Sequence, residues 1–201
     1  MNTPQSFIEK VASLVRYHAF MRGYKYPSAI IAQMCLESNY GNSQLSAIYH
    51  NYFGLKCGAY WSGQSVNMST KEEYTVGTQV QIRDNFRVYD SLENGIRGYF
   101  DFIDTKRYNN LREAVSPEDY LNKIKADGYA TSSKYVENNT RVIKTYSLEK
   151  YDWPTEPDLN MAIDVIAEYV LAHKFGNGHE VRKEMIYDLV RVRVNEKAGG
   201  H

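Results

Sequence analysis

The chain has 201 residues, which is enough for one large domain or for a principal domain with a small second one. Its 24 basic and 24 acidic residues cancel, and this zero net charge argues against a dedicated nucleic-acid-binding protein, whose phosphate contacts need a basic excess. An aromatic content of 13%, with 18 tyrosines, indicates a folded protein rather than a disordered one.

Several classes of protein are excluded by missing patterns. No apolar run reaches membrane-spanning length, so no membrane insertion is expected. The sequence has neither a glycine-rich phosphate loop nor histidines at metal-ligand spacing, so we expect no cofactor and no metal. The two cysteines, Cys35 and Cys57, do not make a disulfide framework, and we expect free thiols. No pattern fixes the oligomeric state; a monomer is the simplest expectation.

The first half of the chain predicts two helices and then a hairpin. Residues 4–22 carry apolar side chains at helical spacing and end at Gly23. A second helix is expected from Ser28, a candidate N-cap, to Glu37. Residues 46–58 should form a loop and a short turn. In residues 64–89 the apolar period changes to two, which predicts a small antiparallel hairpin or three-stranded sheet.

Glu37 is the only carboxylate of the second helix. At about 100° per residue its side chain projects within roughly 20° of Ile30 and 60° of Met34, along the apolar stripe. Burial there, and the negative end of the helix dipole, would favour the protonated form that a general acid needs. The structural alternative is a Glu paired with an Arg or a backbone cap.

A second acidic position falls in the predicted hairpin, where Glu72 and Glu73 are adjacent. One of the two should lie on a solvated strand edge. Glycoside hydrolysis needs an acid and usually a second carboxylate, so a small β-lobe bearing one of them against a helical body would place an acid on each wall of a cleft.

The second half of the chain predicts further helices. One begins at Asp90, which forms a capping-box pattern with Glu93, and another begins at Ser116. Prolines mark residues 152–158 as a short stiff linker. The predicted domains are therefore a principal domain over 1–151, this linker, and a small module over 159–201.

Four segments, in order, resemble motifs of glycoside hydrolase family seventy-three, the β-N-acetylglucosaminidases of bacterial autolysins, flagellar peptidoglycan hydrolases and phage lysins. They are residues 36–43 (LESNYGNS), 51–56 (NYFGLK), 86–91 (FRVYDS) and 128–135 (GYATSSKY). The departures are modest: Tyr40 stands for the commoner Trp, and Tyr52 for the usual Leu.

The resemblance implies a lysozyme-like α+β fold: a mainly helical body with a small antiparallel β-lobe that forms a cleft, plus a small helical C-terminal module. It implies cleavage of the β-1,4 bond after N-acetylglucosamine in bacterial peptidoglycan. The catalytic residues that it implies are Glu37 as general acid, Glu73 as second carboxylate with Glu72 in reserve, and Tyr129. The substrate-binding residues that it implies are Asn51, Phe53, Gly54, Tyr89 and Tyr135.

The tail is similar to the short cell-wall-binding repeats of phage lysozymes, the CW-seven type. Its implied wall contacts are Gly176, Asn177, Gly178 and Arg182. The alternative is a helical appendage that caps the principal domain.

Residues 1–10 lack the basic start and apolar run of a signal peptide. We therefore expect a phage endolysin that stays in the host cytoplasm until lysis and then acts on the cell wall. The alternatives are an N-acetylmuramidase or lytic transglycosylase of the same fold, and a wall-binding or virion structural protein without activity.

Overall fold

The computed structural model describes residues 1–75, 78–153 and 159–173. The chain divides into two compact units, the first covering Met1–Asp152 and the second beginning at Trp153. The elements of the first unit are α1 (Pro4–Arg22), α2 (Pro27–Glu37), α3 (Gln44–Tyr49), β1 (Ser65–Thr75), β2 (Thr78–Arg87), α4 (Leu92–Ile103), η1 (Lys106–Glu113), α5 (Pro117–Ala126), α6 (Tyr135–Thr145) and η2 (Leu148–Tyr151).

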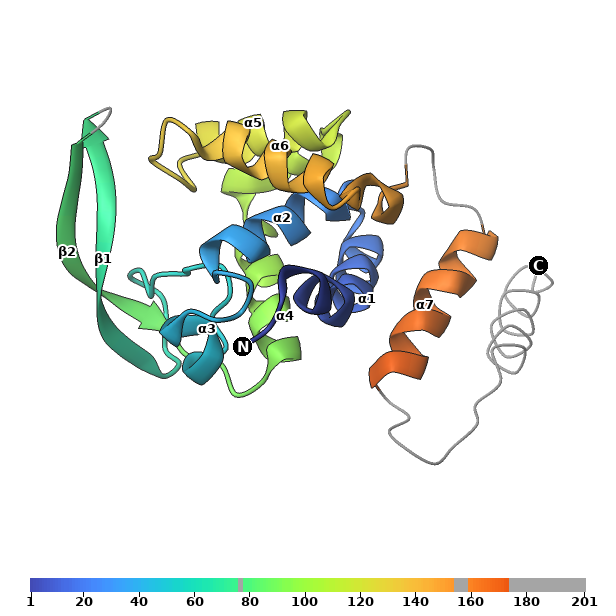
Figure 1. Cartoon of the computed structure of the whole chain (residues 1–201), viewed down its shortest axis with the longest axis horizontal. Coiled ribbons are helices and arrows are strands. Elements are labelled where there is room, and N and C mark those ends of the chain that lie inside the picture. The colour runs from blue at the N-terminus through green and yellow to red at the C-terminus, as the bar shows by residue number, and fades with distance from the viewer. Residues whose placement is uncertain (76–77, 154–158, 174–201) are drawn as a thin grey trace. The chain divides into compact units, whose positions relative to one another are not determined.

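Helix α2 is the centre of the first unit (Figure 1). It packs against α1, α5, α6 and η2, and every residue from Pro27 to Cys35 is buried. Helix α1 covers one side of it and ends, as predicted, at Gly23, whose φ of 74° is the left-handed conformation that a glycine C-cap adopts readily. Because α2 is enclosed by its neighbours, its position and direction are fixed by the core.

The start of α2 differs from the prediction. Ser28 is not the N-cap: Tyr26 occupies that position, and Pro27 and Ser28 are the first helical residues. The cap comes instead from the other end of the unit, where the Asp152 carboxylate accepts hydrogen bonds from the Ser28 backbone N–H (2.8 Å) and the Ser28 hydroxyl (2.6 Å). A carboxylate at a helix N-terminus satisfies free N–H groups and suits the helix dipole. Sequence spacing could not show it, because the partner is 124 residues away.

Strands β1 and β2 form the predicted hairpin as a two-stranded antiparallel sheet. The register pairs Val66 with Phe86 at its base and Glu72 with Val80 near its far end, and it shifts between Glu73 and Thr75. Figure 1 shows the hairpin rising beside the helical body rather than packing flat on it. Its base is anchored in the core, where Phe86 is buried and bridges to Lys56.

Two further local predictions were wrong. The stretch expected as a loop and turn contains α3, which Ser43 caps by accepting a hydrogen bond from the Ser46 backbone N–H (3.2 Å). Helix α4 is capped by Ser91 rather than Asp90: the Ser91 hydroxyl accepts from the Asn94 backbone N–H (3.1 Å). At α4 the cap is one residue from the expected boundary, a shift to which sequence patterns are insensitive, and at α3 the cap Ser43 lies before a stretch in which no helix was expected.

The predicted fold class is confirmed for the first unit, which is mainly helical with one small antiparallel hairpin. Both cysteines are free thiols, as expected, and burial raises the pKa of Cys35 to about 12. In the second unit, α7 (Leu159–His173) is the helix expected at the start of the tail. Among the residues with described coordinates, no helix is both long and apolar enough to cross a bilayer.

Candidate active site

Glu37 is the last residue of α2, and its side chain is exposed. The prediction that it is buried along an apolar stripe was therefore wrong, although Ile30 and Met34 on that stripe are completely buried. The angular position of a residue on a helix gives the direction of its side chain but not how deeply that side chain is buried. Here the last turn of α2 emerges from the core, so the acid is accessible while its helix is not. Its position at the negative end of the helix dipole disfavours the carboxylate charge.

The surroundings of Glu37 come from two of the segments that carry the resemblance. A Cβ atom added to Gly54 would lie 3.7 Å from Glu37 Oε2, so the backbone of this glycine passes close to the acid. Gly54 has a φ of 64°, which a larger residue rarely adopts. The neighbouring carbonyl of Phe53 accepts a hydrogen bond from the Tyr129 hydroxyl (2.8 Å). Segment 51–56 and the loop after α5 are thereby joined beside the acid.

Tyr129 and Tyr135 lie in the electrostatic field of Glu37. The pKa of each phenol is raised well above its ordinary value, first by burial and next by the negative charge of Glu37. The two rings are neighbours, with centroids 6.1 Å apart. Both tyrosines therefore stay protonated at neutral pH, with the Tyr129 hydroxyl bonded to the Phe53 carbonyl and the Tyr135 hydroxyl bonded to Gln33 in the core.

A buried hydrogen-bond chain supports these tyrosines. Gln33, fully buried one turn before Glu37, donates from its amide to the Tyr135 hydroxyl and accepts from the Tyr99 hydroxyl (2.8 Å). Tyr99 in turn shares a hydrogen bond with Tyr120 (2.9 Å). Sequence reasoning missed Gln33. The signal was present: it is a polar residue inside an apolar helix, four positions before the acid and so on the same face.

The residues predicted to bind substrate are placed differently from one another. Phe53 is 2% exposed and stacks on Tyr99 with ring centroids 3.9 Å apart, so its ring belongs to the core and its carbonyl to the site. Asn51 is buried too, and its amide bonds the backbone of Leu55 in both directions and the carbonyl of Arg87. These bonds give Asn51 a structural role, because it holds segment 51–55 against the end of β2.

Tyr89 does not join the group around Glu37. It lines a separate pocket with Trp61 and Arg97, and none of Glu37, Gly54 and the two site tyrosines belongs to that lining. The predicted wall contacts Gly176, Asn177, Gly178 and Arg182 lie outside the described residues. No cluster of three or more His, Cys, Asp or Glu side chains that could hold a metal ion occurs in the part of the chain with coordinates.

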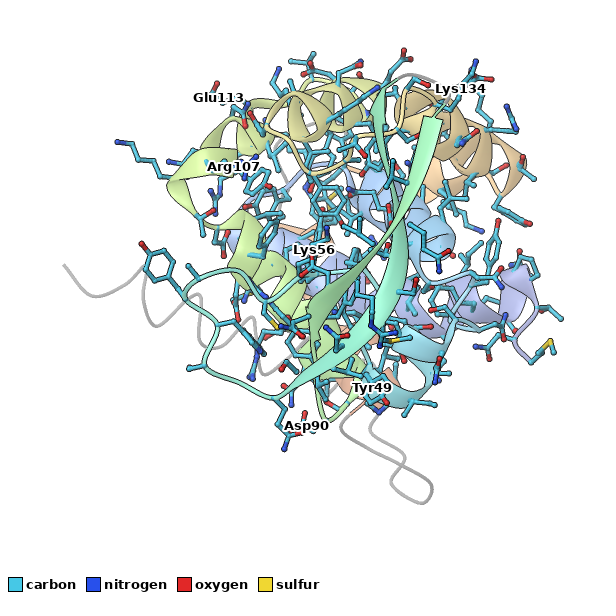
Figure 2. The ribbon with its side chains drawn as sticks, turned by 90° about the vertical axis from the view of Figure 1, so that its left-hand side faces the viewer. Tyr49, Lys56, Asp90, Arg107, Glu113 and Lys134 are labelled. Carbon is cyan, nitrogen blue, oxygen red and sulfur yellow. The ribbon has the colours of Figure 1, made fainter. Side chains whose placement is uncertain are left out.

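The hairpin carries the second acidic position. The structure describes the backbone of Glu72 and Glu73 and not their side chains. The described side chains of β1 alternate in exposure. The even-numbered positions are half-buried (Val66, Met68 and Thr70), and the odd-numbered positions are exposed (Ser65, Asn67 and Ser69). Glu72 is at an even-numbered position of this alternation and Glu73 at an odd-numbered one. In Figure 2 the hairpin crosses in front of the face that bears Lys56, two residues after Gly54.

An accessible acid at a helix end, on a mainly helical body with a small antiparallel lobe, fits the lysozyme-like class of glycoside hydrolases. Residues 17–148 match the Glucosaminidase family model, described as mannosyl-glycoprotein endo-beta-N-acetylglucosaminidase. The chain belongs to this family.

Similar proteins agree with the family assignment. The chain is 32% identical over 157 residues to the exo-glucosaminidase LytG of Bacillus subtilis, covering 74% of this chain and 53% of LytG. It is 34% identical over 160 residues to a probable N-acetylmuramidase of Lactococcus lactis subsp. cremoris, covering 75% of this chain and 36% of that one. It thus spans about half or less of these relatives.

Among solved structures, the catalytic domain of the autolysin Auto from Listeria monocytogenes superposes with a TM-score of 0.61 at 31% identity. The match covers 76% of this chain and 90% of that domain. The similarity therefore extends over most of a catalytic domain.

Proposed function

We propose that the protein is a peptidoglycan hydrolase, an endo-β-N-acetylglucosaminidase that cleaves the β-1,4 bond after N-acetylglucosamine with Glu37 as the general acid. The observation that carries the proposal is the exposed Glu37 carboxyl beside Gly54, Tyr129 and Tyr135. A glycosidic oxygen that reaches this carboxyl can take its proton as the bond breaks. Release of new reducing ends from purified cell walls tests the activity.

Cleavage of the other glycosidic bond of the polymer is the serious alternative to cleavage after N-acetylglucosamine. One similar protein is named an exo-glucosaminidase and another a probable N-acetylmuramidase, and these names refer to different bonds of the same polymer. The fold and the single helix-end acid suit both reactions. The choice of the N-acetylglucosamine bond, and of cleavage within the strand, is what the resemblance of the four ordered segments to the family implies.

For the second carboxylate we propose one of the two adjacent acids of β1. The family motif favours Glu73, which precedes Tyr74. The alternation along the hairpin favours Glu72, because it shares the parity of Val66, whose partner Phe86 is anchored in the core. This carboxylate either activates a water molecule or assists attack by the N-acetyl group of the substrate.

Comparing Glu72→Gln with Glu73→Gln decides between them. The variant that loses the functional carboxylate should release reducing ends about 10²-fold more slowly or worse, because a general base contributes that much. The other should stay within about twofold of wild type, since a solvated strand position has little effect. Each variant is the other's matched control. Equal and small losses in both would exclude the hairpin as the source of the second carboxylate.

For the tail we propose the cell-wall-binding role that its sequence resembles. Deleting residues 155–201 should weaken pull-down of the protein with purified walls while cleavage of soluble glycan fragments continues. Unchanged pull-down would leave the tail as a helical appendage. The similar proteins come from bacteria. The phage endolysin assignment, with residence in the host cytoplasm before lysis, stays a prediction.

A further inference from the structure

A pocket of about 470 Å³ lies beside the base of the hairpin. Its walls come from the segment before β1, the end of β2 with the residues that follow, and one face of α4. Trp61, Arg87 and Tyr89 line it from the hairpin side, and Arg97 and Asp101 line it from α4. Gly98 lets the Tyr89 ring pack directly on α4, because a Cβ atom there would lie 2.4 Å from that ring.

The pocket presents hydrogen-bond donors that the protein does not use. Arg97 is exposed and has neither an ion pair nor a hydrogen bond within the described part of the chain. The Tyr89 ring forms part of the wall, and its hydroxyl is buried against α4 at Gly98 rather than open to a ligand.

The Arg87 side chain is fixed in one orientation by its neighbours. Its Nε atom donates to the Lys56 carbonyl (3.0 Å), and its guanidinium carbon lies 4.8 Å from the centre of the Trp61 ring and 5.4 Å from that of Phe102. A guanidinium fixed in this way loses little freedom when its remaining N–H groups bind a planar, two-oxygen partner.

The acidic residues of the pocket are already engaged. The Asp101 carboxylate accepts from Arg22 Nη2 at 3.0 Å, and Arg22 also pairs with Asp104. The Asp90 carboxylate accepts a hydrogen bond from the Asn94 amide. Both carboxylates thus accept from protein donors, although the neutral Asn94 amide leaves the charge of Asp90 in place. The donors that remain in the pocket are the guanidinium N–H groups of Arg97 and Arg87.

We propose that this pocket binds a free carboxylate of the peptide attached to the glycan strand. This inference rests on the proposed function, since peptidoglycan is the polymer that brings such a group. Its sugars carry hydroxyl and acetamido groups, and the lactyl carboxyl of the muramic acid is amidated by the peptide. The free carboxylates are therefore on the peptide, and a carboxylate is the group that two guanidinium groups fit best.

The pocket is within reach of the same substrate molecule as Glu37. Gly54 lies beside the Glu37 carboxyl, and two residues further along the Lys56 carbonyl receives the Arg87 guanidinium. Two residues of extended chain span at most about 7 Å. In Figure 2, Lys56 lies near the middle of the view and Asp90, which lines the pocket, near its lower edge. The pocket would thus recognise a peptide carried by a sugar close to the cleaved bond.

The test compares Arg97→Ala with wild type, both as the full chain, on two substrates. One is peptidoglycan with its peptides intact, and the other is the same glycan after enzymatic removal of the peptides. Loss of a charge-assisted hydrogen bond should raise KM on the intact polymer about tenfold. Neither kcat nor cleavage of the stripped glycan should change. Arg97→Lys should recover part of the loss. Arg141→Ala, which removes another exposed arginine from α6, is the matched control and should leave both substrates unaffected.

A second measurement identifies the group that is recognised. Binding of the Glu37→Gln protein to the disaccharide with its peptide should weaken about tenfold when the peptide carboxylates are amidated. Equal loss on both polymers in Arg97→Ala, no loss on either, or indifference to amidation would each overturn the proposal. A wild-type protein that cleaves neither polymer would instead refute the proposed function itself.

Discussion

Replacing Glu37 with Gln should lower kcat for release of reducing ends from purified walls by about 10²- to 10⁴-fold, the range that general acid catalysis contributes. The amide keeps the size of the side chain and cannot give up a proton to the leaving oxygen. Because the residue is exposed at the end of α2, its replacement should alter the free energy of unfolding by no more than about 0.5 kcal/mol. Loss of activity would then report chemistry and not misfolding.

The matched control for this experiment is Glu113→Gln. Glu113 is an exposed acid at the end of η1, and Figure 2 shows it at the upper edge of the body, away from the hairpin. This variant should lyse walls at the wild-type rate. If Glu37→Gln also lysed walls within about twofold of wild type, the catalytic assignment would be wrong. A wall-binding or virion structural role would then be the better reading of the fold.

Gly95→Ala adds one methyl group, and it should lower the free energy of unfolding more than the same change at any other described glycine of the first unit. Gly95 is buried in α4, and a Cβ atom built there would lie 2.0 Å from the backbone carbonyl oxygen of His50 and 3.3 Å from the Tyr52 ring. A carbonyl cannot rotate away as a side chain can, so α4 and the segment after α3 must separate. We expect a cost of about 3 kcal/mol, the upper end of the usual range for overpacking.

Thermal unfolding measures this effect. For a chain of this size the expected loss corresponds to a fall in Tm of about 6–12 °C. Gly23→Ala is the control: it has open space around it, so it should cost only about 1 kcal/mol for its left-handed backbone. A Tm for Gly95→Ala no lower than that of the control would show that the close approach of α4 to His50 is not needed. Activity should fall too, since the displaced segment leads into Phe53 and Gly54.

The sequence predicted where the helices and strands lie better than it predicted how deeply individual residues are buried. Residues 4–22, the hairpin and the helix after Ser116 carry clear periodicity and start or stop signals, and the structure has all three. Glu37 was singled out for a burial that it does not have. A helical wheel assumes one apolar face, whereas α2 is enclosed on all sides until its last turn. Glu37 lies at the helix end as predicted, but its side chain is exposed rather than buried.

The contacts that sequence reasoning missed are those between distant segments. Asn51 matches a family motif, yet its amide is fully used in bonds to Leu55 and Arg87. Gln33 belongs to no quoted motif, yet it connects Tyr135 to Tyr99 beneath the acid. The catalytic and binding roles of the predicted residues stay predictions. What the structure adds is that Glu37, Tyr129 and Tyr135, far apart in the chain, come together.

The chemistry of the cleaved bond is tested most directly by mass spectrometry of peptidoglycan digested with the purified protein. Hydrolysis after N-acetylglucosamine predicts fragments whose new reducing ends are N-acetylglucosamine, absent when Glu37→Gln replaces the wild type. New reducing ends on N-acetylmuramic acid, or anhydro-muramic products, would contradict the glucosaminidase assignment and identify a muramidase or a lytic transglycosylase.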